Sequence, residues 1–134
     1  KKVKIYMDET VAQATEVGYT LTMLNRKRYL PDLKSKNRQV REAAGRVAIN
    51  SPVQGRAADL IKLAMIQLAG KIREKKLKSR MILQVHDELV FECPEEEKQE
   101  IQALVKKEME EVVPLKVPLV VDMGWGENWN TAHC

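Results

Sequence analysis

Hydrophobic residues recur at helical spacing along much of the chain. Over residues 1–17 they fall near one face, which predicts a helix that ends at Gly18. A second run, residues 36–50, predicts another helix with a strongly basic outer face. We expect this helix to stop near Asn50, because Pro52 biases Ser51, the residue before it, away from helical geometry.

A third helix is expected directly after that break. Ser51 can cap it, Pro52 suits its first position, and Gln54 stands where a capping-box partner reaches back. The apolar positions then continue to about Ile72, which predicts a central, largely buried helix. After Pro94 the sequence predicts a fourth helix, whose amphipathic stripe is Ile101, Leu104, Val105 and Met109.

Short β-rich stretches between the helices predict two hairpins and one further strand. Residues 19–24 and 26–30 would form the first hairpin, around an Asn that tolerates left-handed turns. Residues 81–85 and 89–92 would form the second. Residues 117–123 are expected to add a last strand, followed by an irregular tail with two Trp. Antiparallel hairpins packed with amphipathic helices predict an α+β fold.

Composition indicates a folded domain with an uneven charge distribution. The 134 residues are 44% hydrophobic and 31% charged, with a net charge of +4, which excludes a disordered tail. Residues 26–46 and residues 54–80 each contain eight basic and two acidic side chains, whereas residues 81–134 contain four basic and twelve acidic ones. A basic middle suits a polyanion such as a nucleic-acid backbone. Two solvated helix faces of opposite sign would give the same counts.

The triplet His86-Asp87-Glu88 is the most distinctive local feature, since it places an imidazole and two carboxylates between short strands. Phosphoryl transfer assisted by two divalent ions needs carboxylate oxygens on a rigid support. The alternative is an ordinary polar turn. Two metals normally need acids from more than one segment, and Asp122, between apolar neighbours, is the only weak second candidate.

Arg46, Asn50 and Gln54 recur every four residues, so a helix carried through them would set a guanidinium and two amides roughly in line. Such donors fit the minor-groove acceptors that every base pair presents in similar places, and so would check pair shape. Alternatively, each has only a local role, in a cap, a helix end or a solvated surface.

Arg26, Lys27 and Arg28 begin a second basic region that could hold phosphates. Further basic side chains follow at Lys34, Lys36, Arg38 and Arg41. A solvated basic face is the alternative. The few aromatic residues argue against a stacking platform for single strands.

Taken together, these stretches closely resemble the C-terminal part of the polymerase domain of family A DNA polymerases, the bacterial DNA polymerase I type. The similarity is carried by RKRYLPD at residues 26–32, RVAINSPVQGRAAD at 46–59, QVHDELV at 84–90 and VPLVVDMGWGENW at 117–129. It covers essentially the whole chain. Arg56 departs from the family, which usually has a small Ser or Thr there, and this Arg must reach phosphate, solvent or an acid such as Asp59.

The resemblance implies a role for each matching residue. Asp87 would be a catalytic metal ligand, with Glu88 assisting at the same Mg²⁺ site, and His86 would touch the primer end. Lys27 and its two basic neighbours would hold DNA. The minor groove of the nascent base pair would be lined by Arg46, Asn50 and Gln54. The implied reaction is attack of a primer 3′-hydroxyl on the α-phosphate of a deoxynucleoside triphosphate, directed by a template.

The resemblance also implies that this chain is one part of a right-hand polymerase. Residues 1 to about 75 would be fingers-side helices with the basic hairpin, and residues from about 76 to 134 would be palm. The family's other catalytic Asp and its nucleotide-gripping helix lie upstream of the matching region. We therefore expect the chain to need the N-terminal part of the polymerase as a partner, and to be inactive alone.

A rival interpretation is a non-catalytic DNA-binding module derived from such a polymerase, in which Asp87 would be idle. A third is an acidic-helix interaction module, which predicts no salt-dependent DNA binding. The sequence contains no apolar run of the length that a membrane helix needs, which predicts a cytoplasmic protein, in a bacterium one that acts at the nucleoid. The residues leave open whether the source is a bacterium, a phage or an organelle.

Overall fold

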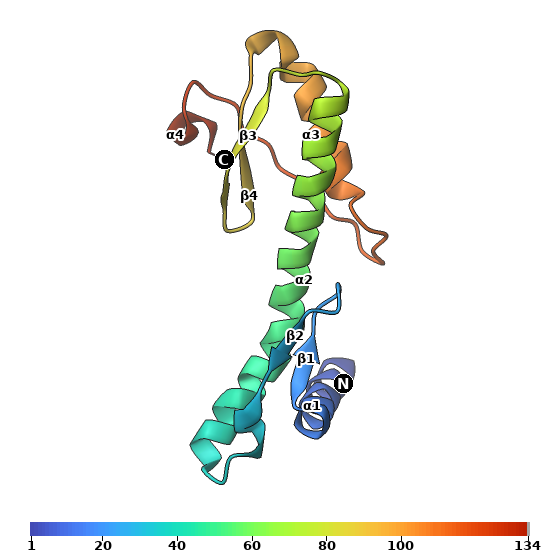
Figure 1. Ribbon diagram of the computed structural model, residues 1–134, viewed down its shortest axis with the longest axis vertical. Helices are drawn as coiled ribbons and strands as arrows, with labels where there is room; N and C mark the ends of the chain where they lie inside the picture. The colour runs from blue at the N-terminus through green and yellow to red at the C-terminus, as the bar shows by residue number, and fades with distance from the viewer. Residues whose placement is uncertain (134) are drawn as a thin grey trace. The chain divides into compact units, whose positions relative to one another are not determined.

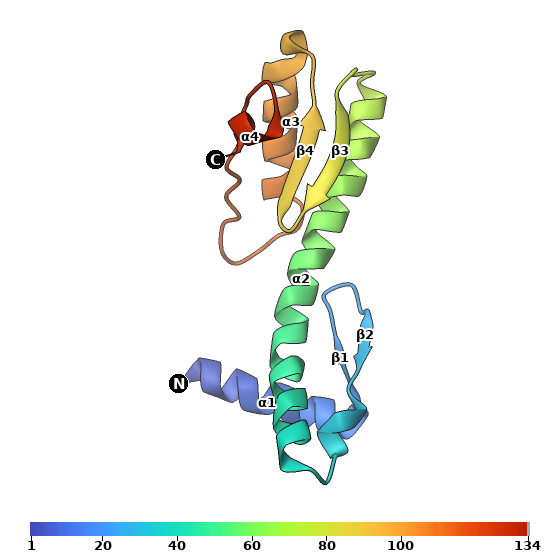
Figure 2. The same ribbon diagram turned by 90° about the vertical axis from the view of Figure 1, so that its left-hand side faces the viewer.

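The computed structural model describes residues 1–133 and has the expected α+β character. Its elements, labelled in Figures 1 and 2, include two separate antiparallel sheets of two strands each. The chain divides into two compact units, residues 1–59 and the residues from 60 onward. Within residues 1–133, no helix combines the length and apolar character needed to cross a bilayer. Residue 134, the last of the predicted palm segment, lies outside the described residues.

The first unit begins with the predicted helix and hairpin. Helix α1 (Lys2–Val17) ends at Gly18, whose φ of 83° is left-handed and whose amide donates to the carbonyl of Ala14 at 2.8 Å. Strands β1 (Tyr19–Leu21) and β2 (Lys27–Tyr29) pair antiparallel, and Asn25 in their turn has a φ of 59°. A short 3₁₀ helix, η1 (Pro31–Lys34), follows. The predicted hairpin and its turn residue are therefore confirmed.

Alanine and leucine side chains make the core of the first unit. Ala14 of α1, Leu30 and Leu33 around η1, and Ala44 and Ala48 of the next helix form one buried cluster. The cluster joins α1, η1 and the next helix in one core.

Helix α2 runs without interruption from Arg38 to Glu74, and the expected break at Pro52 is wrong. Ser51 is helical and buried, and neither it nor Gln54 forms the predicted cap. A proline inside a helix removes one hydrogen bond and costs about 3 kcal/mol. Burial of apolar residues before it (Ala44, Ala48) and after it (Ala64, Leu68) outweighs that local cost.

The second unit packs a hairpin on helices. Strands β3 (Arg80–Val85) and β4 (Glu88–Glu92) pair antiparallel, as predicted. A 3₁₀ turn, η2 (Glu95–Glu97), leads into helix α3 (Lys98–Glu110), beside which the hairpin lies in Figure 2. The predicted stripe is confirmed, since its first three members are buried and the fourth packs against them, together with Leu68, Met81, Leu89 and Phe91.

Residues 117–123 do not form the additional strand that the sequence predicts. Pro118 has no amide to donate to a ladder, and among residues 1–133 the segment has no partner strand. The amide of Val121 instead donates to the Glu110 carboxylate at 3.0 Å, and the carboxylate of Asp122 is exposed. The tail is irregular as expected, apart from a short helix, α4 (Trp129–Ala132).

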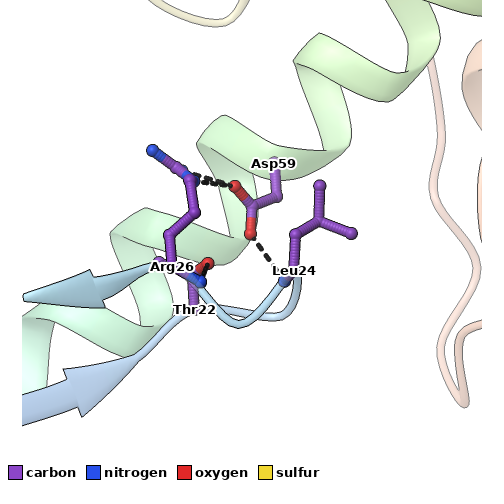
Figure 3. Close-up of polar contacts among 4 residues, drawn as sticks. All are labelled: Thr22, Leu24, Arg26 and Asp59. Atoms are coloured by element: carbon purple, nitrogen blue, oxygen red, sulfur yellow. Dashed lines mark hydrogen bonds and ion pairs between the residues drawn. The ribbon is translucent and has the colours of Figure 1, made fainter.

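A buried carboxylate fastens the first hairpin to α2 (Figure 3). The side chain of Asp59 is fully buried, and its Oδ1 accepts from Arg26 Nε at 2.8 Å and from Arg26 Nη2, while Oδ2 accepts from the Leu24 amide at 2.9 Å. Burial alone would raise the pKa of Asp59. Hydrogen bonds from Thr22, Leu24 and Arg26, with the Arg26 charge, outweigh burial and hold this pKa below its ordinary value.

Gly55 allows the hairpin to approach the helix closely. A Cβ at this position would lie 2.4 Å from Cγ2 of Thr22, well inside van der Waals contact. Thr22 has little freedom to move away, because its hydroxyl accepts from the Arg26 amide at 3.3 Å and also bonds to Asp59.

Replacing Gly55 by Ala should therefore destabilise the first unit, although Ala is the better helix former. Overpacking costs about 1–3 kcal/mol, whereas the gain in helix propensity is about 1 kcal/mol. Adding Thr22→Ser, which deletes Cγ2 and keeps the hydroxyl, should restore or exceed the original stability. Urea unfolding followed by circular dichroism measures both effects, and a stable single variant Gly55→Ala would contradict the close approach.

The Asp59 pair should also make stability depend on pH in the acid range. Since the folded pKa lies below the unfolded value of about 3.9, the stabilisation is complete above that value and is lost as pH falls through the folded pKa. Asp59→Asn should lower the free energy of unfolding by about 1–3 kcal/mol at pH 7, and by progressively less below about pH 4. The exposed acid Asp32, changed to Asn, is the matched control. A deficit equal at pH 7 and pH 3 would refute the charge pair.

Candidate functional site

The His86-Asp87 pair forms a two-residue turn between β3 and β4. His86 has a φ of 52°, in the left-handed region that His enters more readily than most side chains. Its carbonyl accepts a hydrogen bond from the side-chain amide of Gln84, which helps to hold the turn. Asp87 follows with an exposed carboxylate at the end of the hairpin. The short hairpin therefore holds the Asp87 carboxylate at a fixed place at its end.

A bulge in β3 sets the register next to this turn. Met81 pairs with Phe91, whereas Leu83 pairs with Val90, so Ile82 is the extra residue. Beyond the bulge, Val85 lies directly opposite Glu88. Bulges shift every following side chain by one position and often occur beside functional groups. The bulge thus brings Leu83 and Val85 onto the face of the ribbon that carries Val90 and Glu88, a feature that no local sequence pattern indicated.

Glu88 contacts the C-terminal tail. Nδ1 of His133 lies 3.3 Å from Oε1 of Glu88. This contact is an ion pair when the imidazole is protonated. Helix α4 places this histidine, since Asn128 caps the helix by accepting from the Thr131 amide while the Thr131 hydroxyl accepts from the Asn128 amide. Sequence reasoning missed the contact. The Asn-x-x-Thr spacing was the available signal for the cap.

The two acids have the chemistry of a metal site but do not complete one. Carboxylate oxygens are the ligands that Mg²⁺ prefers, so Asp87 and Glu88 fit as one side of such a site. Residues 1–133 contain no group of three or more His, Cys, Asp or Glu side chains placed to hold a metal ion. Further ligands would have to come from outside the described part of the chain.

The basic hairpin of the first unit divides into a structural and an exposed part. Arg26 forms an ion pair with Asp59. The side chain of Arg56 is exposed and does not bind this carboxylate. Lys27 lies with its Nζ 4.6 Å from the centre of the Tyr19 ring, and Arg28 is exposed. All three predicted phosphate contacts are therefore exposed, but Arg26, whose side chain is 49% exposed, also holds the hairpin in place through Asp59.

Continuity of α2 brings the three predicted groove contacts onto one side of a single helix. Arg46, Asn50 and Gln54 are all exposed and follow one another at four-residue intervals, the spacing of neighbours on a helix surface. The predicted break would have separated the last of them from the other two. Because α2 continues through Pro52, these three side chains are aligned more regularly than the sequence predicted.

Comparison with known proteins identifies the family. The family model of DNA polymerase family A matches residues 1–131. DNA polymerase I of Caldicellulosiruptor bescii is 56% identical over 96% of this chain and 15% of its own length, and that of Mycobacterium tuberculosis H37Rv is 52% identical over 97% and 14%.

A solved structure agrees with the sequence comparisons. It is described as the POL domain of Pol1 from M. smegmatis in complex with DNA primer-template and dNTP, and it matches 96% of this chain and 23% of its own with a TM-score of 0.93 and 52% identity. The chain thus spans about one seventh of the curated relatives. With the match over residues 1–131, the chain belongs to DNA polymerase family A.

Proposed function

We propose that this chain contributes part of the active site of an enzyme for template-directed DNA synthesis. The observation that carries the proposal is the two-residue turn that presents Asp87 beside Glu88 at the end of a bulged hairpin, in a chain of family A. The related Pol1 domain, described with primer-template and dNTP, supports the same partners here. The reaction would join a primer 3′-hydroxyl to the α-phosphate of a deoxynucleoside triphosphate.

Asp87 and Glu88 would hold Mg²⁺, which when bound supplies Lewis-acid stabilisation of charge on the transferred phosphate. His133 would orient the Glu88 carboxylate through the 3.3 Å contact. His86, exposed on the same turn, would contact the primer end. Arg46, Asn50 and Gln54 would donate to minor-groove acceptors and so report pair shape independently of sequence.

We assign residues 1 to about 75 to the fingers side and those from about 76 to 134 to the palm. The compact units instead divide inside α2, after Asp59. The N-terminal part of the polymerase would be the protein partner that completes the metal site. A bacterial relative of this kind would act in the cytoplasm, at the nucleoid.

The isolated chain should not extend a primer, because residues 1–133 contain no group of three or more potential metal ligands and Asp87 with Glu88 would supply only one side of the metal site. The purified chain is incubated with a labelled primer-template, all four deoxynucleoside triphosphates and Mg²⁺, and products are resolved on a denaturing gel. Circular dichroism checks folding in the same preparation. Any extension that depends on this chain would disprove its inactivity.

Within a complete polymerase that carries this segment, Asp87→Asn should reduce nucleotide incorporation by about a thousandfold or more, since metal assistance supplies several kcal/mol. Affinity for primer-template should change only a few-fold. Glu95→Gln, a change at another exposed acid of the same unit, is the control. Near-normal incorporation by the Asp87 variant would favour the non-catalytic DNA-binding module instead.

A further inference from the structure

The tail of the second unit, residues 125–133, is fastened at several points. The ring of Trp125 packs against the core cluster beside α3, and Nζ of Lys98 lies 4.7 Å from the centre of that ring. A few residues later, the capping box of Asn128 and Thr131 starts α4. Figure 1 shows the β3–β4 hairpin between α3 and α4. The tail therefore runs from the core on one side of the hairpin to a capped helix on the other.

Gly126 allows the tail to fold back closely on α4. A Cβ at this position would lie 2.6 Å from the carbonyl carbon of Thr131 and 2.7 Å from the amide nitrogen of Ala132. These are backbone atoms, which cannot rotate away as the end of a side chain can. Any larger residue would therefore push the two segments apart. The missing side chain at Gly126 thus helps to fix where α4 ends, and with it where His133 lies.

The fastened tail places His133 beside the acid Glu88. The imidazole meets the Trp129 ring edge to face, with the ring centres 6.4 Å apart, while its Nδ1 lies 3.3 Å from Oε1 of Glu88. Leu89 packs against the core, so its neighbour Glu88 points to the opposite face of the ribbon. The His133 and Glu88 side chains are 55% and 42% exposed, and an exposed pair adds little to stability. Stability alone therefore does not explain this placement.

The contact limits what Glu88 can offer to a metal ion. A hydrogen bond donated by Nδ1 occupies Oε1, which leaves Oε2 as the available oxygen. Mg²⁺ demands strict octahedral geometry and is bound through few carboxylates, whereas Ca²⁺ accepts about six to eight oxygens and takes carboxylates through one oxygen or both. Selectivity between the two ions depends on the number and flexibility of the ligands. A Glu88 carboxylate held by one oxygen therefore favours Mg²⁺.

We propose that His133 is a positioning residue that makes the metal site select Mg²⁺ over Ca²⁺, because it donates a hydrogen bond from Nδ1 to one oxygen of Glu88. The fastened tail is the support that holds the imidazole in place. The inference rests on the proposed function, in which Asp87 and Glu88 hold Mg²⁺, and adds to it the residue that decides which ion is bound.

The first test measures metal affinity without turnover. A complete polymerase that carries this segment is bound to a primer-template with a dideoxy primer end and a deoxynucleoside triphosphate, and Mg²⁺ and Ca²⁺ are titrated by calorimetry. His133→Ala should raise the ratio of Ca²⁺ affinity to Mg²⁺ affinity about tenfold, since changes at the partners of metal ligands commonly alter metal affinity by roughly 10–100-fold. An unchanged ratio would overturn the proposal.

Two isosteric variants test which nitrogen acts. The side-chain amide nitrogen of Asn stands close to the place of Nδ1, and that of Gln stands close to the place of Nε2. His133→Asn should therefore keep the wild-type ratio, whereas His133→Gln should behave like His133→Ala. Rescue by Gln and not by Asn would contradict a hydrogen bond from Nδ1.

Gly126→Ala tests the support without changing either member of the contact. The added Cβ should displace α4 and raise the ratio of affinities as His133→Ala does. Gly70→Ala is the matched control in the same unit, because a Cβ there would meet nothing within 4 Å, and it should keep the wild-type ratio. A wild-type ratio in Gly126→Ala would overturn the role of the tail.

Thermal unfolding of the same proteins separates selectivity from folding. His133→Ala should melt close to the wild-type temperature, because an exposed pair adds little to stability. A variant that melts markedly lower and weakens both ions equally would show a merely structural histidine and overturn the assignment.

Nitrogen NMR of the 134-residue chain reads the hydrogen bond directly. The chain contains two histidines, His86 and His133, so one ¹⁵N-labelled sample follows both imidazoles. At alkaline pH, where a neutral imidazole carries hydrogen on one nitrogen only, His133 should carry it on Nδ1 in a larger share than His86. Glu88→Ala should remove that difference. Equal shares in the wild type would contradict the proposed bond.

The outcomes distinguish this inference from the proposed function. If Asp87→Asn abolishes incorporation while His133→Ala keeps the wild-type ratio of affinities, the role of His133 is wrong and the proposed function stands. If Asp87→Asn leaves incorporation near normal, the metal site of the proposed function fails, and the selectivity assigned to His133 fails with it.

Discussion

The first unit depends on one buried negative charge. The carboxylate of Asp59 has no access to solvent and is retained because a guanidinium and a backbone amide, contributed by a hairpin more than thirty residues earlier, surround it. Removing a charge from water is costly unless partners replace the lost hydration. Here the groups that replace the lost hydration belong to the turn of the hairpin. The charge can therefore stay buried only while the hairpin packs against α2.

This arrangement explains how a flexible basic segment acquires a defined position. Two-stranded ribbons are marginally stable by themselves. The ion pair, the absent side chain at Gly55 and the small residues of the nearby core together give this ribbon a rigid support. Arg26 stabilises the support, and Lys27 and Arg28 can then present charge at fixed places. One run of three basic residues thus has two different physical roles.

Local patterns predicted the elements better than the contacts between them. The left-handed turn at Asn25, the amphipathic stripe of α3 and the hairpin around Asp87 each follow from neighbouring residues alone. The break at Pro52 was wrong because burial on both sides of the proline outweighs its local preference. Residues 117–123 carry a strand-like pattern, but pairing also needs a partner. The contacts of Asp59 and His133 join residues far apart in sequence, which no local pattern records.

The two-residue turn that carries Asp87 also limits which lengths of sequence this fold accepts. Because Leu89 and Phe91 hold β4 against the core, one residue inserted between β3 and β4 would enlarge the turn and displace Asp87 from its place between the two strands. A deletion would leave too few residues to close the ladder. Residues 112–127 form no helix or strand, so insertions there would leave the hairpin register intact. Changes in chain length among descendants of this sequence should therefore accumulate in that connection and be excluded from the turn.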